Sequence, residues 1–110
     1  MSAFKIMWLV VMFDLPTQTK KDRKRYRWLS RFLDAQSYMR IQYSVYAKVF
    51  NSMGSANNGK KKLRDFVRTN IKKGNVRMLL FTDTQFGKME IIVGESSIQE
   101  EIAQPSLFDF

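Results

Sequence analysis

Apolar residues along this chain follow two different spacings, and their succession predicts the order of strands and helices. The run from Ile6 to Phe13 is apolar throughout and ends at Asp14, which is typical of a short strand buried on both faces. Residues 38–50 alternate between apolar and polar side chains, so we expect two short strands there, joined by a tight bend. Residues 76–82 predict a further strand, and residues 89–93 predict a last short one.

The first basic segment between these strands has helical spacing. In residues 20–35, Leu29 and Leu33 lie on an apolar stripe, while the basic residues fall mainly on the other side. Thr19 and Asp22 form the sequence pattern of an N-terminal helix cap. We therefore expect the first helix to begin directly after Thr19.

A second basic segment follows residues 51–59, which are rich in Gly, Ser and Asn and predict a loop. An apolar stripe that includes Leu63 and Ile71 predicts a helix after this loop, and Gly74 is expected to end it. Residues 83–87 predict a turn between the last two strands, because an Asp and a Gly bracket them.

The predicted order is strand, helix, strand, strand, helix, strand, with an additional short strand at the end. This order is that of the α+β ferredoxin-like (βαββαβ) arrangement, in which one sheet carries both helices on the same face. The opposite face would stay uncovered in a monomer, so we expect a homodimer. We assign residues 1–95 to this domain and residues 96–110 to a C-terminal tail.

The charge of the chain is strongly positive and is concentrated in its first part. The 110 residues include 19 Lys and Arg against 10 Asp and Glu, which gives a net charge of +9. Residues 1–77 carry 18 of these basic residues and four of the acidic ones. Such a surface favours a polyanionic partner and predicts contacts with nucleic-acid phosphates. The residues expected to make them lie on the two helices: Lys20, Arg23, Lys24, Arg27, Arg31, Lys60, Lys61, Lys62, Arg64 and Arg68.

The residue types present limit the reactions that the chain can catalyse and the metal sites that it can form. It has no Cys and no His, which excludes disulfides, thiolate metal sites and the usual general base near neutral pH. Asp14, at the end of the first strand, is a candidate Mg²⁺ ligand, although a turn-forming role before Pro16 explains it equally well. The apolar run at residues 6–13 is too short to span a bilayer, so we expect a cytoplasmic protein without membrane binding.

Three segments resemble a known protein family, in the right order and over nearly the whole chain. They read FDLPTQTKKDRK at residues 13–24, IQYSVY at residues 41–46 and VRMLLFTDTQF at residues 76–86. Together they are similar to the small CRISPR-associated protein, often labelled an endoribonuclease, that pairs with the spacer integrase. The resemblance implies a ferredoxin-like homodimer that holds protospacer duplex DNA, with integrase dimers at the duplex ends. It also implies that Asp14 is a Mg²⁺ ligand shared across the dimer axis.

Three functions stay open at this point. The leading hypothesis is a scaffold in spacer acquisition that binds the backbone of double-stranded DNA, with RNA as the other nucleic acid to consider. The second is a Mg²⁺-dependent endonuclease or endoribonuclease with Asp14 as its catalytic residue, and the lack of the His that many family members carry weakens its case for proton transfer. The third is a toxin-like, metal-dependent messenger ribonuclease on the same fold.

The tail has a short motif of its own. Gln104, Leu107 and Phe108 belong to the segment QPSLF, which resembles peptides that dock into the bacterial sliding clamp. The alternative, which we favour, is that the apolar residues of the tail pack on the dimer partner or on the integrase.

Overall fold

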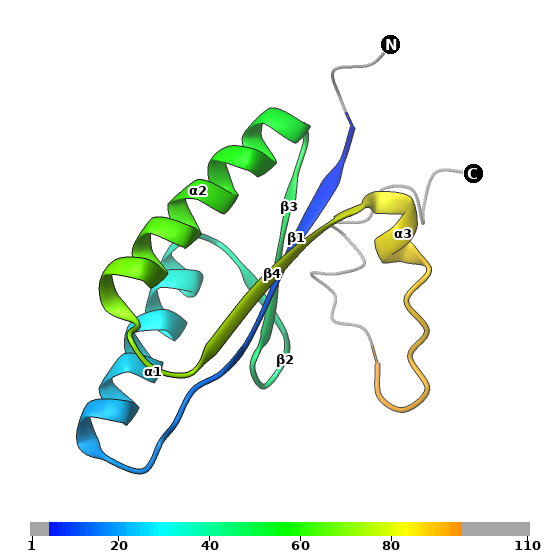
Figure 1. Cartoon of the computed structure of the whole chain (residues 1–110). Helices are drawn as coiled ribbons and strands as arrows, with labels where there is room; N and C mark the ends of the chain where they lie inside the picture. Colours follow the sequence, from blue (N-terminus) through cyan, green and yellow to red (C-terminus); the bar gives the residue numbers. More distant parts are fainter. Residues whose placement is uncertain (1–4, 96–110) are drawn as a thin grey trace.

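The computed structural model describes residues 5–95 and is built around one antiparallel sheet (Figure 1). Its strands are β1 (Met7–Asp14), β2 (Met39–Gln42), β3 (Val45–Phe50) and β4 (Asn75–Thr82), and they lie in the order β2-β3-β1-β4. β1 is therefore interior, paired with β3 on one side and with β4 on the other. This strand order, with two helices on one face, confirms the predicted α+β ferredoxin-like arrangement.

The strands follow the hydrophobic pattern closely. Trp8, Leu9 and Val11 of β1 are fully buried although they point to alternate faces, which confirms the prediction of a strand covered on both sides. β2 and β3 are the two short strands predicted from the alternating segment, joined by a turn at residues 43–44.

α1 (Lys20–Ala35) begins where the capping pattern predicts. The Thr19 hydroxyl accepts a hydrogen bond from the backbone N–H of Asp22 (3.0 Å), and the Asp22 carboxylate accepts one from the N–H of Thr19 (3.1 Å). This reciprocal pair satisfies two backbone donors that a helix start leaves without partners. The bond from the Thr19 N–H also lowers the pKa of Asp22, so the carboxylate stays ionised beside the positive end of the helix.

α2 (Met53–Asn70) begins earlier than predicted, because residues 53–59 are helical rather than a loop. Ser52 caps the helix, since its hydroxyl accepts a hydrogen bond from the N–H of Ser55 at 3.1 Å. Gly and Asn cost at most about 1 kcal/mol each in a helix relative to Ala. The cap and the complete burial of Ala56 against the sheet offset that cost.

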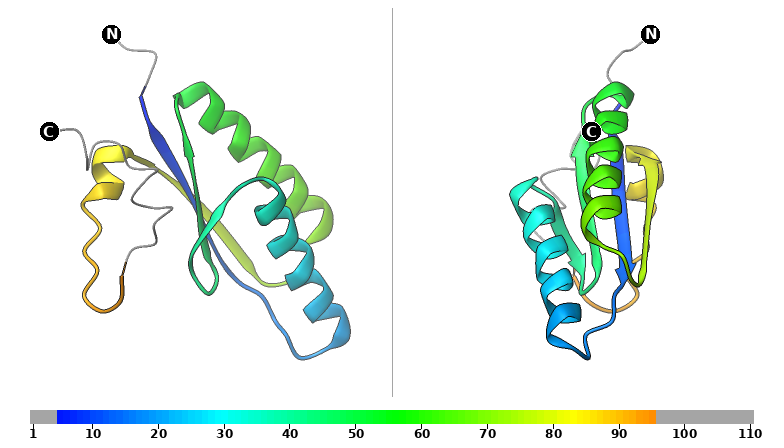
Figure 2. Two further views of the ribbon diagram at one scale, coloured as in Figure 1. Left: turned by 180° about the vertical axis from the view of Figure 1, so that it is seen from behind. Right: turned by 60° about the vertical axis from the view of Figure 1, so that its left-hand side comes forward.

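Both long helices lie on the same face of the sheet and run in opposite directions (Figures 1 and 2). Phe32 of α1 and Phe66 of α2 stack with their ring centroids 4.1 Å apart, which joins the two helices. The larger hydrophobic cluster fills the space between helices and sheet, and its buried members are Leu9, Val11, Phe13, Leu15, Leu29, Leu33, Tyr38, Tyr46, Leu63 and Ile71.

The other face of the sheet is covered by α3 (Asp83–Gly87), a helix of five residues. Figure 2 shows it on the side away from α1 and α2. The Phe86 ring stacks on Trp8 with centroids 3.9 Å apart, and the Trp8 indole N–H donates a hydrogen bond to the Asp83 carboxylate at 2.9 Å. The buried cluster on this face is small: Trp8, Val10, Ala47 and Phe86.

Two predictions for the end of the described chain are wrong. Residues 83–87 form α3 rather than a turn, because Thr82 and Gln85 make a capping box. Residues 89–93 form no strand, so the additional C-terminal strand is absent from the part of the chain described. A strand exists only where a neighbour takes its backbone N–H and C=O groups, and the sheet of residues 5–95 offers these residues none. Ile92 and Val93 are left 86% and 91% exposed.

Candidate nucleic-acid interface

The first turns of α1 form a strongly basic surface. Lys20, Lys21, Lys24 and Arg27 are exposed and line a shallow hollow together with Arg23. Like charges three or four residues apart on a helix repel one another, and the helix dipole adds positive potential at this end. A bound anion would relieve both effects, so this part of α1 favours phosphate groups.

Two of these side chains are also held by contacts within the chain. The Arg23 guanidinium donates hydrogen bonds to the backbone carbonyls of Thr17 (3.1 Å) and Gln18 (3.0 Å). The Lys24 ammonium lies 5.2 Å from the centroid of the Trp28 ring, close enough for a cation–π contact. Arg23 therefore fixes the chain at the start of α1 in addition to contributing charge.

α2 carries a second set of basic residues, one of which is neutralised locally. Lys61 forms an ion pair with Asp65 at 2.8 Å, and this hydrogen bond lowers the pKa of Asp65. The pair is exposed and adds little stability, but it cancels a positive charge on the surface. The predicted phosphate-binding residues of this helix are all exposed or half-buried: Lys60, Lys61, Lys62, Arg64 and Arg68.

The helices that carry the two sets of charges cover the same face of the sheet (Figure 2). Among residues 5–95, the ion pairs are Arg25–Asp22 at 3.1 Å and Lys61–Asp65. The predicted phosphate-binding residues other than Lys61, including Arg31 further along α1, therefore form no ion pair in this part of the chain. These basic residues of the two helices make up the basic face of α1 and α2.

Asp14 is exposed at the end of β1, where the chain leaves the sheet toward α1 (Figure 1). It pairs with Asn75 in the register of β1 and β4. Gly74, just before β4, has φ +93°, and a Cβ there would lie 2.7 Å from the Asp14 carbonyl oxygen. Glycine is thus required for this close approach. The prediction that Gly74 ends the second helix is wrong, since α2 ends at Asn70.

Asp14 belongs to no cluster of three or more potential metal ligands (His, Cys, Asp or Glu) within residues 5–95. Mg²⁺ binds through one or two carboxylates and keeps several waters. Asp14 can supply one such carboxylate.

Comparison with known proteins decides the family. The family model described as "CRISPR associated protein Cas2" matches residues 7–89, which span the four strands and all three helices. This chain belongs to the Cas2 family. The "CRISPR-associated endoribonuclease Cas2" of Acidovorax ebreus is 36% identical to it over 105 residues, which cover 93% of this chain and 100% of that protein. A Cas2 of the same description from Parvibaculum lavamentivorans is 38% identical over 89 residues, covering 81% and 85% of the two chains.

A solved structure described as "Crystal structure of cas2" has a TM-score of 0.58 to this chain and covers 84% of it and 92% of the solved chain. The two sequences are 15% identical, so this likeness shows the fold alone. The resemblance seen in the three sequence motifs is confirmed at the level of the Cas2 family.

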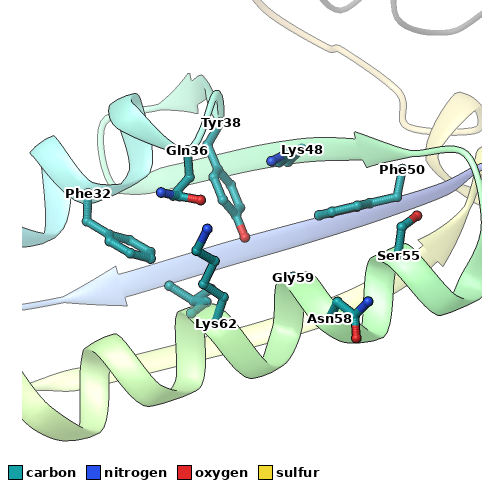
Figure 3. Close-up of a pocket in the computed structure, with 10 residues that line it drawn as sticks. Phe32, Gln36, Tyr38, Lys48, Phe50, Ser55, Asn58, Gly59 and Lys62 are labelled. Carbon is teal, nitrogen blue, oxygen red and sulfur yellow. The ribbon is translucent and has the colours of Figure 1, made fainter.

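Sequence reasoning missed two basic residues of this Cas2 chain. Lys21 lines the hollow on α1, and the run of basic residues around it was the signal that could have included it. Lys48 of β3 lines a pocket with Lys62 of α2 (Figure 3). Nothing in the linear sequence joins these two lysines, because the contact depends on how α2 packs over the sheet.

Two further expectations concern membrane binding and the C-terminal tail. Among the helices of residues 5–95, none combines the length and apolar character needed to cross a bilayer. The tail, with Gln104, Leu107 and Phe108 of the proposed clamp-binding motif, lies outside the described residues.

Proposed function

We propose that this Cas2 family chain is a subunit of CRISPR spacer acquisition that binds the backbone of protospacer duplex DNA. The observation that carries the proposal is the basic face of α1 and α2, whose predicted phosphate-binding residues, apart from Lys61, form no ion pair within residues 5–95. Lys and Arg contacts with phosphates give affinity without reading base sequence. That property suits a protein that holds spacers of many sequences, and RNA is the alternative ligand.

The proposed subunit works as a homodimer together with the CRISPR integrase. On the sheet face opposite the long helices, and on the segment after α3, apolar side chains remain 44% to 91% exposed: Leu79, Met89, Ile91, Ile92 and Val93. A second copy that covers them would remove an apolar patch from water. Two copies would also present two sets of basic helices to one duplex, leaving its ends for integrase dimers.

A second candidate function is Mg²⁺-dependent cleavage of RNA or DNA. The exposed carboxylate of Asp14 at the end of the sheet favours it, and the relatives carry endoribonuclease names. Two copies of Asp14 near a dimer axis would repel each other unless a cation lay between them. Mg²⁺ in that position would supply a Lewis acid for a phosphate oxygen, while the carboxylates of the two chains would hold the ion.

Duplex binding, measured by fluorescence anisotropy over a range of salt concentrations, tests the scaffold function. Arg27→Gln should weaken binding and lower the slope of log K against log salt by about 0.9 for each phosphate that the variant no longer neutralises. Lys88→Gln is the matched control, because it removes the same charge beyond α3, away from the basic helices. Equal weakening in the two variants would contradict a duplex site on α1 and α2.

Asp14→Asn separates the two candidate functions. If the chain is a scaffold, the variant keeps its affinity for duplex and supports spacer acquisition in cells at the level of the unmodified protein. If it is a nuclease, purified protein cleaves RNA or DNA with Mg²⁺, and cleavage disappears in the variant and in EDTA. Failure of acquisition in a folded Asp14→Asn dimer would contradict the scaffold function.

A further inference from the structure

A pocket of about 180 Å³ opens where α1, α2 and β3 meet, next to the basic face (Figure 3). It lies between elements that are far apart in the sequence, and none of its lining residues is an Asp or a Glu. The residues that matter to its chemistry are two lysines, a tyrosine, a glutamine and two phenylalanines: Lys48, Lys62, Tyr38, Gln36, Phe32 and Phe50.

Two ammonium groups share this pocket. Lys62 rises from α2 toward Tyr38, and Lys48 lies above it on β3 (Figure 3). Burial and, after it, the charge of Lys62 lower the pKa of Lys48. Neither lysine is in an ion pair within residues 5–95. Lys48 is half-buried and Lys62 is exposed, and an anion bound between the two cations would offset their repulsion.

Neutral hydrogen-bonding groups lie beside the lysines. The hydroxyl of Tyr38 points toward α2, with the Gln36 amide next to it (Figure 3). Burial raises the pKa of Tyr38 to about 12, so its hydroxyl stays protonated and can donate to an anion. The pocket therefore offers two charged donors together with two neutral ones.

Aromatic rings also line the pocket. The Lys48 ammonium lies 5.2 Å from the centroid of Phe50 and 5.8 Å from that of Tyr38. The Phe50 ring lies against Gly59 of α2, where an added Cβ would come within 2.4 Å of the ring. Glycine is unfavourable within a helix, and at this position it gives the Phe50 ring the space to lie along the pocket.

We propose that this pocket binds the phosphate monoester of a nucleotide, with the phosphate between Lys48 and Lys62 and the base against Phe50. Its volume is below the roughly 300 Å³ at which pockets for drug-sized ligands begin, which fits one nucleotide end rather than a longer strand. The phosphodiesters of a duplex lie on the outer faces of α1 and α2, whereas a terminal monoester enters between the helices. The proposal does not depend on duplex binding.

Titration of the full chain with adenosine 5′-monophosphate, followed by calorimetry and by amide NMR shifts of the pocket residues, tests it. Lys48→Gln and Lys62→Gln should each weaken binding about tenfold, the loss expected for one charge-assisted hydrogen bond. Lys88→Gln is the matched control, because it removes the same charge after α3, outside the pocket and away from α1 and α2. Its affinity for the nucleotide should change less than about twofold.

Two further measurements distinguish binding in the pocket from a general effect of positive charge and from misfolding. Tyr38→Phe keeps the ring and the charge but should weaken binding several-fold, and adenosine without phosphate should bind at least about tenfold more weakly. Equal weakening in Lys88→Gln and Lys62→Gln would overturn the proposal. So would shifts that spread over both helices without favouring the pocket, in variants whose circular dichroism matches that of the parent chain.

The phosphate monoester could come from a free nucleotide or from the 5′ end of a strand. Short single strands with a 5′-phosphate or a 5′-hydroxyl distinguish the sources, because only the first should compete with adenosine 5′-monophosphate if strand ends enter the pocket. Duplex affinity of the same variants is measured separately. If Arg27→Gln loses duplex binding and keeps nucleotide binding, the result bears on the scaffold function. If a pocket variant loses nucleotide binding and keeps duplex binding, the result bears on the pocket.

Discussion

The two faces of the sheet differ in how completely this one chain buries them. On the face under α1 and α2, ten residues form a buried cluster that two helices cover. On the opposite face, four residues are buried under a helix of five residues, and Leu79 beside them stays 50% exposed. The first face is a finished core within one chain, whereas the second has the composition of an interface that a partner completes.

This difference in burial also separates the roles that we propose for the two faces. The face covered by α1 and α2 carries its charges on the outer sides of these helices, so a polyanion can bind there without changing the core. The unfinished face is apolar, and six of the ten acidic residues of the chain come after residue 77 in the sequence. A protein of this size gains from covering such a face, so the proposed association and the proposed nucleic-acid binding would use opposite sides of the sheet.

The same substitution on the two faces should give the largest contrast. Leu33→Ala opens a cavity beneath α1 and should cost about 2–5 kcal/mol, because this side chain is fully buried. Leu79→Ala on the other face should cost less than about 1 kcal/mol in a monomer. Denaturant unfolding at low protein concentration measures both. Similar destabilisation by the two substitutions would mean that the two faces are equally well packed.

Trp8→Phe tests how firmly α3 is attached. The new ring can still stack on Phe86, but the Asp83 carboxylate loses the indole donor at 2.9 Å. The loss of this buried hydrogen bond should cost about 1–3 kcal/mol. Amide hydrogen exchange would show the loss as faster exchange confined to α3 and the adjoining end of β4. Uniform acceleration over the whole chain would instead show that α3 is part of the main cooperative unit.

Asp22→Asn tests the electrostatic contribution to the helix-covered face. The pKa of Asp22 is lowered, mainly by the hydrogen bond from the Thr19 N–H. A lowered pKa means that this stabilisation is complete above the ordinary value of 3.8 and is lost as the pH falls through the folded-state pKa. The stability difference between parent and variant should therefore be largest near neutral pH and shrink in acid. A difference that is constant down to about pH 2 would exclude the charge as its cause.

The smallest expected effect on folding is that of Ile92→Ser, since this side chain is 86% exposed. Its change in monomer stability should lie within about 0.5 kcal/mol. If a second copy covers this region, the variant should nevertheless dissociate at higher concentration than the parent chain in sedimentation velocity runs. Identical dissociation of the two proteins would place the dimer contact elsewhere.

Local signals made most of the fold predictable from the sequence. The Thr19 and Asp22 pattern located the start of α1, and the alternating segment separated β2 from β3. The prediction of a loop at residues 51–59 is wrong. It gave more weight to the Gly, Ser and Asn content than to the cap at Ser52 and the buried side of the helix. The strand predicted at residues 89–93 failed because alternation describes side chains, while a strand also requires a neighbour.

The candidate sites were predictable to different degrees. The basic helices follow from spacing alone, and every predicted phosphate-binding residue is exposed or half-buried. The pairing of Lys61 with Asp65 and the use of Arg23 at the start of α1 depend on side-chain geometry. The pocket between Lys48 and Lys62 depends on tertiary packing, and no spacing in the sequence predicts it.

The two tryptophans give each face of this protein its own spectroscopic reporter. Trp8 is fully buried against Phe86, whereas Trp28 is 40% exposed on α1 under Lys24. Trp28→Phe would leave an emission that follows the docking of α3, and Trp8→Phe would leave one that responds to a ligand on the basic helices. Intrinsic fluorescence could thus follow events on the two sides separately, without an attached label.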